Sequence, residues 1–238
     1  MKKKISVSWS GGKDSAFALY KILSADEYEV VGLHTVLNAE TRRVGMHGVQ
    51  ESLIEAQAAS LRLPVEKLFL EPSESHAAYT ELIHNFYDRC VAQGIVGIMF
   101  GDIFLEDLKK FRDEVLQQHE LVGIYPLWNV NSSILIHDFI NLGFQTMVCS
   151  ANADLLPKHM VGATIDATFV ASLPANADPC GENGEYHSFV YSGPIFHAPI
   201  NLVKGEVVER VYRFRTLDEY GEERLEQTAF WFQDLSLS

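Results

Sequence analysis

Short apolar runs alternate with longer segments of helical periodicity over the first 130 residues. The short runs are rich in β-branched and aromatic residues and predict strands. These strands are expected at Ile5–Trp9, Glu29–Val36, Val65–Leu70, Ile95–Phe100 and Val122–Pro126. Helices are expected between them, at Asp14–Ser24, Val49–Leu61, Ser75–Gln93 and Leu105–His119. This alternation predicts an α/β fold with a five-stranded parallel, Rossmann-like sheet and helices on both faces.

The pattern changes after Trp128. One more helix, Ile134–Asn141, and one more strand, Gln145–Cys149, precede a long segment rich in proline and glycine. Near the end, Val207–Phe214 alternates like a strand. We therefore expect a boundary near residue 130, with a ligand-binding domain at 1–130 and a smaller α+β domain at 131–238.

An open parallel sheet binds its ligand beyond the carboxyl ends of its strands, where the winding direction reverses. The loops after Trp9, Leu33, Phe100 and Pro126 are the expected places.

The first of these loops has the composition of a phosphate site. It reads Ser10-Gly11-Gly12-Lys13-Asp14-Ser15 and joins the first strand to the first helix. Glycines let the backbone approach a ligand closely, and the free N–H groups of a helix start attract anions. Lys13 adds a charge, and Ser10 and Ser15 add hydroxyl groups. Asp14 would hold Mg²⁺ beside the phosphates or cap the helix; the alternative for the whole loop is an ordinary strand-to-helix turn.

A second unusual segment lies in the C-terminal half. It reads Asp178-Pro179-Cys180-Gly181-Glu182-Asn183-Gly184-Glu185-Tyr186-His187-Ser188 and precedes an apolar run. Two acids and a histidine so close together suit metal binding, general base catalysis or the orientation of an amine. The alternative is a tight polar turn whose carboxylates bind its own backbone.

These motifs together resemble a known family. The hexapeptide Ser10–Ser15 is similar to the PP-loop of the adenine nucleotide α-hydrolase-like superfamily, which includes the N-type ATP pyrophosphatases and has a HUP-type sheet. Gly-Glu-Asn-Gly-Glu-Tyr-His at 181–187 resembles the Glu-Gly-Gly-Glu-Tyr-His/Glu motif of the diphthine–ammonia ligase family. Gly101-Asp102-Ile103 and Pro126-Leu127-Trp128 are similar to the mid-chain pattern of that family. Asn183, where the family often has glycine, is a departure that concerns the acceptor more than the ATP chemistry.

The resemblance implies a two-step amidation. An acceptor carboxylate would attack the α-phosphate of ATP and release pyrophosphate, and ammonia would then displace AMP. The implied catalytic residues are Lys13, Asp14, Asp102, Glu182, Glu185 and His187, with Asp14 also the Mg²⁺ ligand. The implied nucleotide-binding residues are Ser10, Gly11, Gly12, Lys13, Asp14 and Ser15 for the phosphates, with His34, Thr35 and His47 near adenine and ribose. Each of these histidines has a purely structural role as its alternative.

The overall charge bears on the partners. The chain carries 32 acidic and 19 basic residues, a net charge of −13, which disfavours binding to nucleic acid. Its basic clusters are expected to be solvated surface or phosphate contacts. They are Arg42 and Arg43; Lys109, Lys110 and Arg112; and Arg210, Arg213 and Arg215.

Apolar segments and cysteines bear on the compartment. The absence of a long apolar segment predicts a cytoplasmic protein without a membrane span. The three cysteines, Cys90, Cys149 and Cys180, do not suggest a disulfide framework.

Three alternatives stay open at this stage. A tRNA-modifying PP-loop enzyme that thiolates a base would need a reactive thiol, for which Cys180 is the exposed candidate. A nucleotide-binding sensor would bind ATP without turnover. The acceptor could equally be a small metabolite instead of a protein side chain. The ammonia source and the oligomeric state are also open, with a homodimer among the options.

Overall fold

A computed structural model describes residues 2–71, 76–217 and 223–238. Its first sheet has five strands, all parallel, in the order β3-β2-β1-β4-β5. They are β1 (Lys3–Ser8), β2 (Tyr28–Asn38), β3 (Val65–Leu70), β4 (Ile95–Met99) and β5 (Val122–Ile124). The predicted α/β fold is thus confirmed. The winding reverses between β1 and β4, so the loops that follow these two strands border the expected ligand position.

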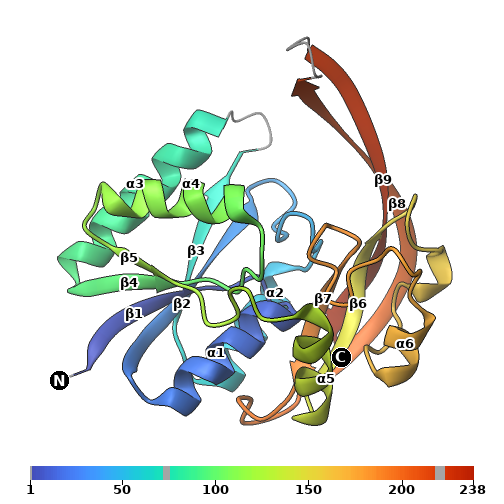
Figure 1. Cartoon of the computed structure of the whole chain (residues 1–238), viewed down its shortest axis with the longest axis horizontal. Helices are drawn as coiled ribbons and strands as arrows, with labels where there is room; N and C mark the ends of the chain where they lie inside the picture. Colours follow the sequence, from blue (N-terminus) through green and yellow to red (C-terminus); the bar gives the residue numbers. More distant parts are fainter. Residues whose placement is uncertain (1, 72–75, 218–222) are drawn as a thin grey trace.

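Helices cover both faces of this sheet (Figure 1). The helices α1 (Lys13–Ala25) and α2 (Glu51–Leu61) lie on one face, and α3 (His76–Ala92) and α4 (Glu106–Gln117) lie on the other. Each pair packs its apolar side against the β-branched strand residues and forms a separate apolar cluster. The predicted helix start at Ser75 falls outside the described residues.

One strand is longer than its pattern predicts. The strand β2 was expected to end at Val36, with a ligand loop after Leu33, but it continues to Asn38 because it pairs with β3 along its whole second half. His34 and Thr35 therefore lie inside a strand, between β1 and β3, and the prediction of a loop at this position is wrong.

The remaining chain builds a second, antiparallel sheet in the order β7-β6-β9-β8. Its elements are α5 (Ser132–Asn141), β6 (Gln145–Asn152), a short 3-10 helix at Lys158–Met160, α6 (Ala167–Ser172), β7 (Tyr186–Ser192), β8 (Leu202–Leu217) and β9 (Glu223–Leu237). This confirms the α+β character of the C-terminal part. The hairpin of β8 and β9 extends well beyond the body of the molecule (Figure 1).

The second sheet packs against the helix layer formed by α1 and α2. One apolar cluster joins Phe17 of α1, Leu53 of α2, Phe139 of α5 and Phe189 of β7. The rings of Phe139 and Phe144 stack at 4.4 Å between centroids. The two sheets lie on either side of residue 130, and whether the two parts are separate domains stays a prediction. No helix in the described part of the chain is long and apolar enough to cross a membrane.

Candidate functional site

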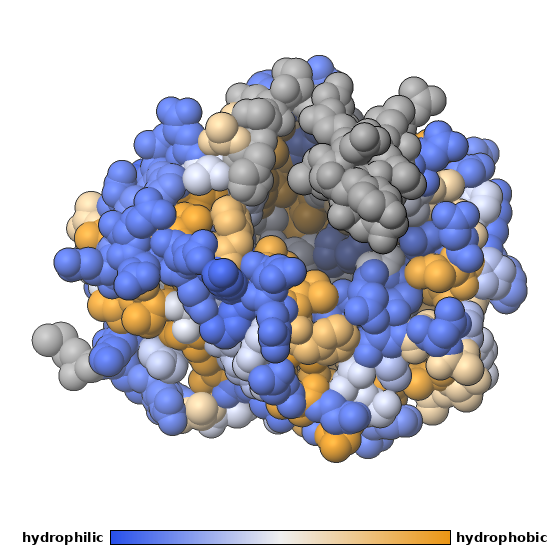
Figure 2. Space-filling model, turned by 45° about the horizontal axis from the view of Figure 1, so that its top comes forward, coloured by the Kyte–Doolittle hydropathy of each residue, from blue (hydrophilic) through white to orange (hydrophobic). Residues whose placement is uncertain are grey.

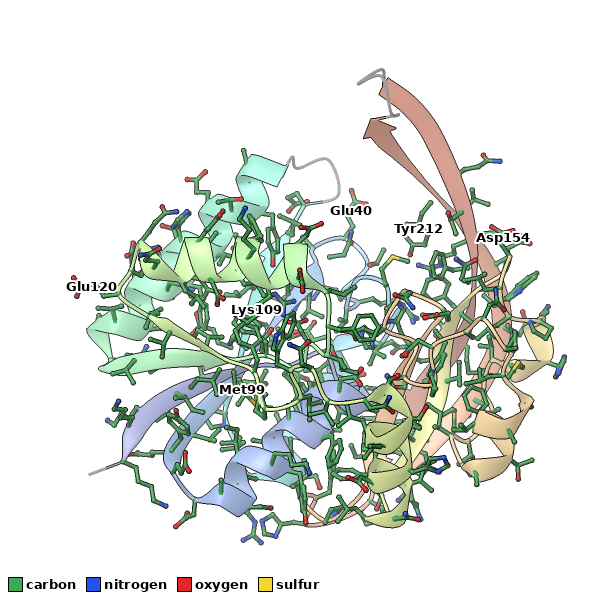
Figure 3. The ribbon with its side chains drawn as sticks, viewed as in Figure 1. Glu40, Met99, Lys109, Glu120, Asp154 and Tyr212 are labelled. Carbon is green, nitrogen blue, oxygen red and sulfur yellow. The ribbon has the colours of Figure 1, made fainter. Side chains whose placement is uncertain are left out.

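A polar cavity lies at the carboxyl edge of the parallel sheet, where β1 and β4 end. The first turn of α1, the loop between β4 and α4 and the segment before β7 all contribute to its wall. It is lined by Ser8, Ser10, Lys13, Asp14, Ser15, His47, Gly101, Asp102, Leu105, Arg112, Gly181, Glu182, Tyr186, His187 and Ser188. Figure 3 labels Met99 at the end of β4 and Lys109 on α4; the cavity residues Gly101, Asp102 and Leu105 lie between these two in the chain. Viewed from the side of α3 and α4, the surface is hollowed and mostly hydrophilic around the hollow (Figure 2).

The Ser10–Ser15 loop presents an open helix start to this cavity. Gly12 is the N-cap of α1 and makes no side-chain cap bond. The Ser10 hydroxyl accepts from the Gly12 N–H at 3.3 Å, and the Ser15 hydroxyl donates to the Gly12 carbonyl at 3.0 Å. Gly11 has φ +81°, a conformation that favours glycine. This combination of glycines, hydroxyls and helix N–H groups suits a phosphate.

Side chains and backbone of the second half hold the loop in place. Ser188 accepts from the Lys13 N–H through its hydroxyl at 3.1 Å, and the Val190 N–H donates to the Gly11 carbonyl at 2.9 Å. Gln57 of α2 is fully buried and donates to the carbonyls of Gly11 and Val190. Its own oxygen accepts from Trp9 Nε1 at 2.8 Å. Gln57 and Ser188 were not predicted as site residues.

Lys13 and Asp14 form an ion pair at the floor of the cavity. Lys13 Nζ lies 2.8 Å from Asp14 Oδ2 and 5.2 Å from the centroid of the Tyr186 ring. The Lys13 side chain is 5% exposed, whereas that of Asp14 is 31% exposed and faces the cavity. Burial favours the neutral amine, but the charge and hydrogen bond of Asp14, together with Tyr186 and Cys180, outweigh it and raise the pKa of Lys13. Lys13 is therefore charged and can bind an anion in the cavity.

Three carboxyl groups face one another across the cavity. Burial raises the pKa of Asp14 and of Asp102 above their usual range, against the pull of Lys13 and Arg112. Glu182 accepts from the Ile103 N–H at 2.8 Å. Burial, with a further contribution from Asp14, raises the pKa of Glu182 to about 7. A carboxyl group with this pKa can accept and release a proton near neutral pH.

Arg112 is placed differently from its prediction as solvated surface. It lies on the side of α4 that faces the sheet, and its guanidinium packs over the Phe100 ring at 4.4 Å. Its Nη1 donates to Asp102 Oδ2. Arg112 is a cavity residue because α4 covers the carboxyl ends of β4 and β5. The helical pattern alone does not reveal this, since a charged residue at this spacing is typical of an exposed face.

The two basic neighbours of Arg112 on α4 are placed separately. Lys109 pairs with Asp113 and lies over the Tyr125 ring, while Lys110 is 77% exposed.

The other basic clusters are tied to their surroundings. Arg42 pairs with Glu51, Arg43 pairs with Asp234, and Arg210 lies over the Phe232 ring. The side chains of Arg213 and Arg215 lie outside the described part of the chain.

Unlike Glu182 and His187, which line the cavity, Glu185 is directed into its own turn. Its side chain is buried, and its carboxylate accepts from the Asp178 N–H at 2.8 Å and the Asn183 N–H at 3.0 Å. Glu185 does not belong to the cavity wall. The geometry thus favours the polar-turn alternative for Glu185, which holds the segment that carries Glu182, and its role in catalysis stays a prediction.

His47 and His187 lie together on the second-sheet side of the cavity. Their ring centroids are 4.7 Å apart, and His47 Nδ1 lies 3.1 Å from the Ser188 carbonyl oxygen. Burial lowers the pKa of His47 to about 4 and that of His187 well below its usual value. Both are neutral at physiological pH. His47 was expected to close over the base, but it lies beside the Ser10–Ser15 loop.

A second, more apolar cavity adjoins the first, toward β2, α3 and α4. It is lined by Ser8, Trp9, Ser10, His34, Thr35, Val36, Val44, Tyr79, Thr80, Ile83, Tyr87, Phe100, Phe111, Arg112 and Val115. The His34 ring lies tilted against Phe86, with centroids 4.3 Å apart, and its Nδ1 is hydrogen-bonded to the Ser6 hydroxyl. Burial lowers the pKa of His34 to about 3. Among the described residues, the buried Thr35 Oγ1 has no hydrogen-bond partner. An apolar cavity with such a group suits a nucleobase or ribose. The α3 and α4 walls were not predicted.

The cysteines do not supply a reactive thiol. All three are buried, including Cys180, whose thiol donates to the Ser132 carbonyl at 3.3 Å. Burial raises the pKa of Cys180 to about 12. The prediction of an exposed Cys180 is therefore wrong, because the turn at 178–185 folds over it.

Comparisons with known proteins cover nearly the whole chain. A family model described as the diphthamide synthase N-terminal domain matches residues 3–123, and one described as the diphthamide synthase C-terminal domain matches residues 131–218. The human protein named diphthine–ammonia ligase is 25% identical over 231 residues, which cover 86% of this chain and 85% of the relative. The protein of that name from Schizosaccharomyces pombe is 25% identical over 219 residues, 84% of this chain and 36% of the relative.

One solved structure is also similar. It is described as a predicted subunit of tRNA methyltransferase from Methanocaldococcus jannaschii and matches with a TM-score of 0.39 and 15% identity. The match covers 71% of this chain and 85% of that one. A likeness at this level carries no inference.

Proposed function

The chain belongs to the diphthamide synthase family, as its motifs predicted, and from this premise we propose that it amidates a carboxylate with ATP and ammonia. It is an ATP-dependent ligase of the diphthine–ammonia ligase type. The acceptor that we propose is a carboxylate on a protein side chain. The observation that carries the proposed amidation reaction is the polar cavity, in which an open helix start, Lys13 and Glu182 face the same space.

The first step activates the acceptor. A carboxylate oxygen of the acceptor attacks the α-phosphorus of ATP, the bond from this phosphorus to the bridging oxygen breaks, and pyrophosphate leaves with the electron pair. The Ser10–Ser15 loop binds the β- and γ-phosphates through its N–H groups and hydroxyls. Lys13 offsets the charge that grows on the leaving pyrophosphate. The product is an acyl adenylate.

The second step forms the amide. The nitrogen of ammonia attacks the acyl carbon, the bond from this carbon to the phosphate oxygen breaks, and AMP leaves. The nitrogen must lose one proton to become an amide. We assign this proton to the Glu182 carboxylate, because its pKa of about 7 suits proton transfer at neutral pH. His187 and His47, both neutral, border the same space and would help to orient the acceptor.

The residues present fit a magnesium ion bound together with ATP. The described residues contain no group of three metal-binding side chains that could hold a metal by themselves. Mg²⁺ is commonly bound by one or two carboxylates with phosphate oxygens and water. Asp14, partly exposed to the cavity, would hold it, with Asp102 nearby. When bound, the ion neutralises phosphate charge during the transfer.

The test is product analysis of ATP cleavage. The protein, Mg-ATP and ammonium are incubated with a protein extract that supplies acceptors, and the nucleotides are separated. We expect AMP and pyrophosphate, with at least a hundredfold loss of AMP formation in Lys13→Ala and Asp14→Asn. Lys110→Ala is the matched control, because Lys110 is 77% exposed, and it should retain full activity.

Two outcomes would contradict the proposal. Formation of ADP and phosphate would mean that the bond cleaved lies beyond the α-phosphate. Tight ATP binding without cleavage in the presence of ammonium and extract would favour the sensor. The thiolating alternative is disfavoured already, because the buried cysteines have raised pKa values.

A further inference from the structure

The apolar and the polar cavity meet at a small set of shared residues. Ser8, Ser10 and Arg112 belong to the walls of both. A nucleotide that places its base in the apolar cavity and its terminal phosphates on the Ser10–Ser15 loop must pass this junction. The group that lies there in such a nucleotide is the α-phosphate, with the ribose beside it.

The junction has one cationic side chain, which is paired with Asp102. Of the described residues that line both cavities, Ser8 and Ser10 are neutral and Arg112 is a cation. Lys13 lines the polar cavity and not the apolar one, so it lies away from the junction. The histidines of the polar cavity are neutral because burial lowers their pKa values. The charge that could offset an α-phosphate is thus that of Arg112.

Arg112 is held in a fixed orientation. The Phe100 ring packs against one face of its guanidinium, at 4.4 Å, and Asp102 accepts from Nη1. A guanidinium has five N–H donors in a planar fork, so it can keep its bond to Asp102 and still donate to a phosphate. A lysine would offer its three donors from a single nitrogen, without the planar fork that holds the two contacts in fixed directions.

We propose that Arg112 binds the α-phosphate, first in ATP and then in the acyl adenylate, and that Asp102 acts as its positioning residue. The inference rests on the proposed function and assigns two phosphate contacts to two residues. Lys13 binds the part of ATP that leaves as pyrophosphate. Arg112 binds the part that stays, and it retains the adenylate until ammonia attacks.

The test compares three ligands that differ in their phosphates. Dissociation constants for adenosine, AMP and ATP are measured by calorimetry for the wild type, Arg112→Gln, Arg112→Lys, Lys13→Gln and the exposed control Lys110→Gln. We expect Arg112→Gln to raise the dissociation constants of AMP and ATP alike, by about tenfold to a hundredfold, which is the range for hydrogen bonds to a charged group. Adenosine should change less than about twofold, which also shows that the variant is folded. Lys13→Gln should weaken ATP far more than AMP.

Asp102 is tested in the same assay. If Asp102 acts by positioning Arg112, Asp102→Asn weakens the binding of AMP less than Arg112→Gln does. The double variant then binds AMP no more weakly than Arg112→Gln alone. A further loss in the double variant would overturn the positioning role.

The remaining outcomes are equally decisive. An Arg112→Gln variant that loses adenosine as strongly as AMP, or that loses ATP alone, would overturn the α-phosphate contact. Failure of the wild type to bind any of the three ligands would overturn the proposed function and this inference with it. Normal nucleotide binding in Arg112→Gln would overturn only the inference.

Discussion

At the residue scale, the raised pKa of Glu182 makes a prediction that needs no substrate. The folded-state pKa is about 7 against an ordinary value of 4.5, so between these pH values the folded protein retains a proton that the unfolded chain releases. The stability contributed by this group is present below pH 4.5 and is lost as the pH rises to 7. We expect Glu182→Gln to remove this loss. The unfolding free energy of the variant minus that of the wild type should therefore be about 3 kcal/mol larger at pH 8 than at pH 4.5.

Urea unfolding at several pH values measures this difference. The exposed Glu40, labelled in Figure 3, supplies the matched control Glu40→Gln, which should follow the wild type at every pH. Parallel curves for the wild type and Glu182→Gln would show that Glu182 is ionised freely in the folded protein and would remove it as a proton acceptor near neutrality.

Gln57 supports a second prediction at this scale. It satisfies the Trp9 indole N–H and the carbonyls of Gly11 and Val190 in a site with no exposure. Gln57→Leu leaves buried polar groups without partners, each at about 1–3 kcal/mol. We expect a total loss of roughly 2–4 kcal/mol in unfolding free energy and weaker ATP binding. The exposed Gln117→Leu should change neither, and a Gln57→Leu variant as stable as the wild type would contradict the assigned hydrogen bonds.

These examples show which site residues a sequence can reveal. Lys13 and Asp14 stand in a contiguous loop whose composition indicates its chemistry, and Glu182 stands in a similar motif. Gln57 and Arg112 reach the site from helices whose own pattern gives no signal. Their roles depend on which strand each helix covers, and periodicity along the chain does not contain that information.

At the scale of elements, the end of β4 packs directly against the start of α1. A Cβ added at Gly101 would lie 2.7 Å from the Asp14 carbonyl carbon and 2.8 Å from the Ser15 nitrogen, both backbone atoms. Gly101→Ala must therefore displace the helix start. We expect at least a tenfold loss of ATP affinity in titration calorimetry, because in the proposed function the N–H groups of that turn bind the phosphates.

The control for this prediction is another glycine. A Cβ at Gly45 meets nothing within 4 Å, so Gly45→Ala should bind ATP like the wild type. Unchanged affinity in Gly101→Ala would mean that the helix start and the end of β4 can separate without harm to the site.

The sequence predicted the elements of the parallel sheet better than those of the second sheet. The strands and helices that build the parallel sheet were found within a few residues, because each has a strong apolar period. The strand β9 (Glu223–Leu237) and the short α6 were not predicted. The strand β9 mixes polar and apolar residues because its sheet is partly exposed. It pairs with β8 and β6, and strand preference depends on such neighbours, which the local pattern does not show.

At the scale of the whole molecule, the two halves share one apolar cluster and hydrogen bonds at the Ser10–Ser15 loop. Besides the parallel sheet, the helices α1 and α2 pack against the second half, within one apolar cluster that includes Phe189 of β7 and the Phe139 and Phe144 stack. The Ser10–Ser15 loop donates a hydrogen bond from the Lys13 N–H to the Ser188 hydroxyl and accepts one at the Gly11 carbonyl from the Val190 N–H. The cavity wall therefore belongs to both halves: one carries the Ser10–Ser15 loop, and the other carries Glu182 and His187.

The last prediction concerns the boundary expected near residue 130. Residues 1–130 without the second half would expose Phe17 and Leu53 and would remove the hydrogen bond from the Val190 N–H to the Gly11 carbonyl. Burying one such side chain contributes about 1.5–3 kcal/mol, which is a large part of the stability of a small domain. We expect this fragment to unfold without a sharp transition and to bind ATP at least a hundredfold more weakly than the full chain. Thermal unfolding by near-ultraviolet circular dichroism and calorimetric titration with ATP measure both. A fragment with a cooperative transition and full ATP affinity would show instead that residues 1–130 are an autonomous domain and that the second half serves the acceptor alone.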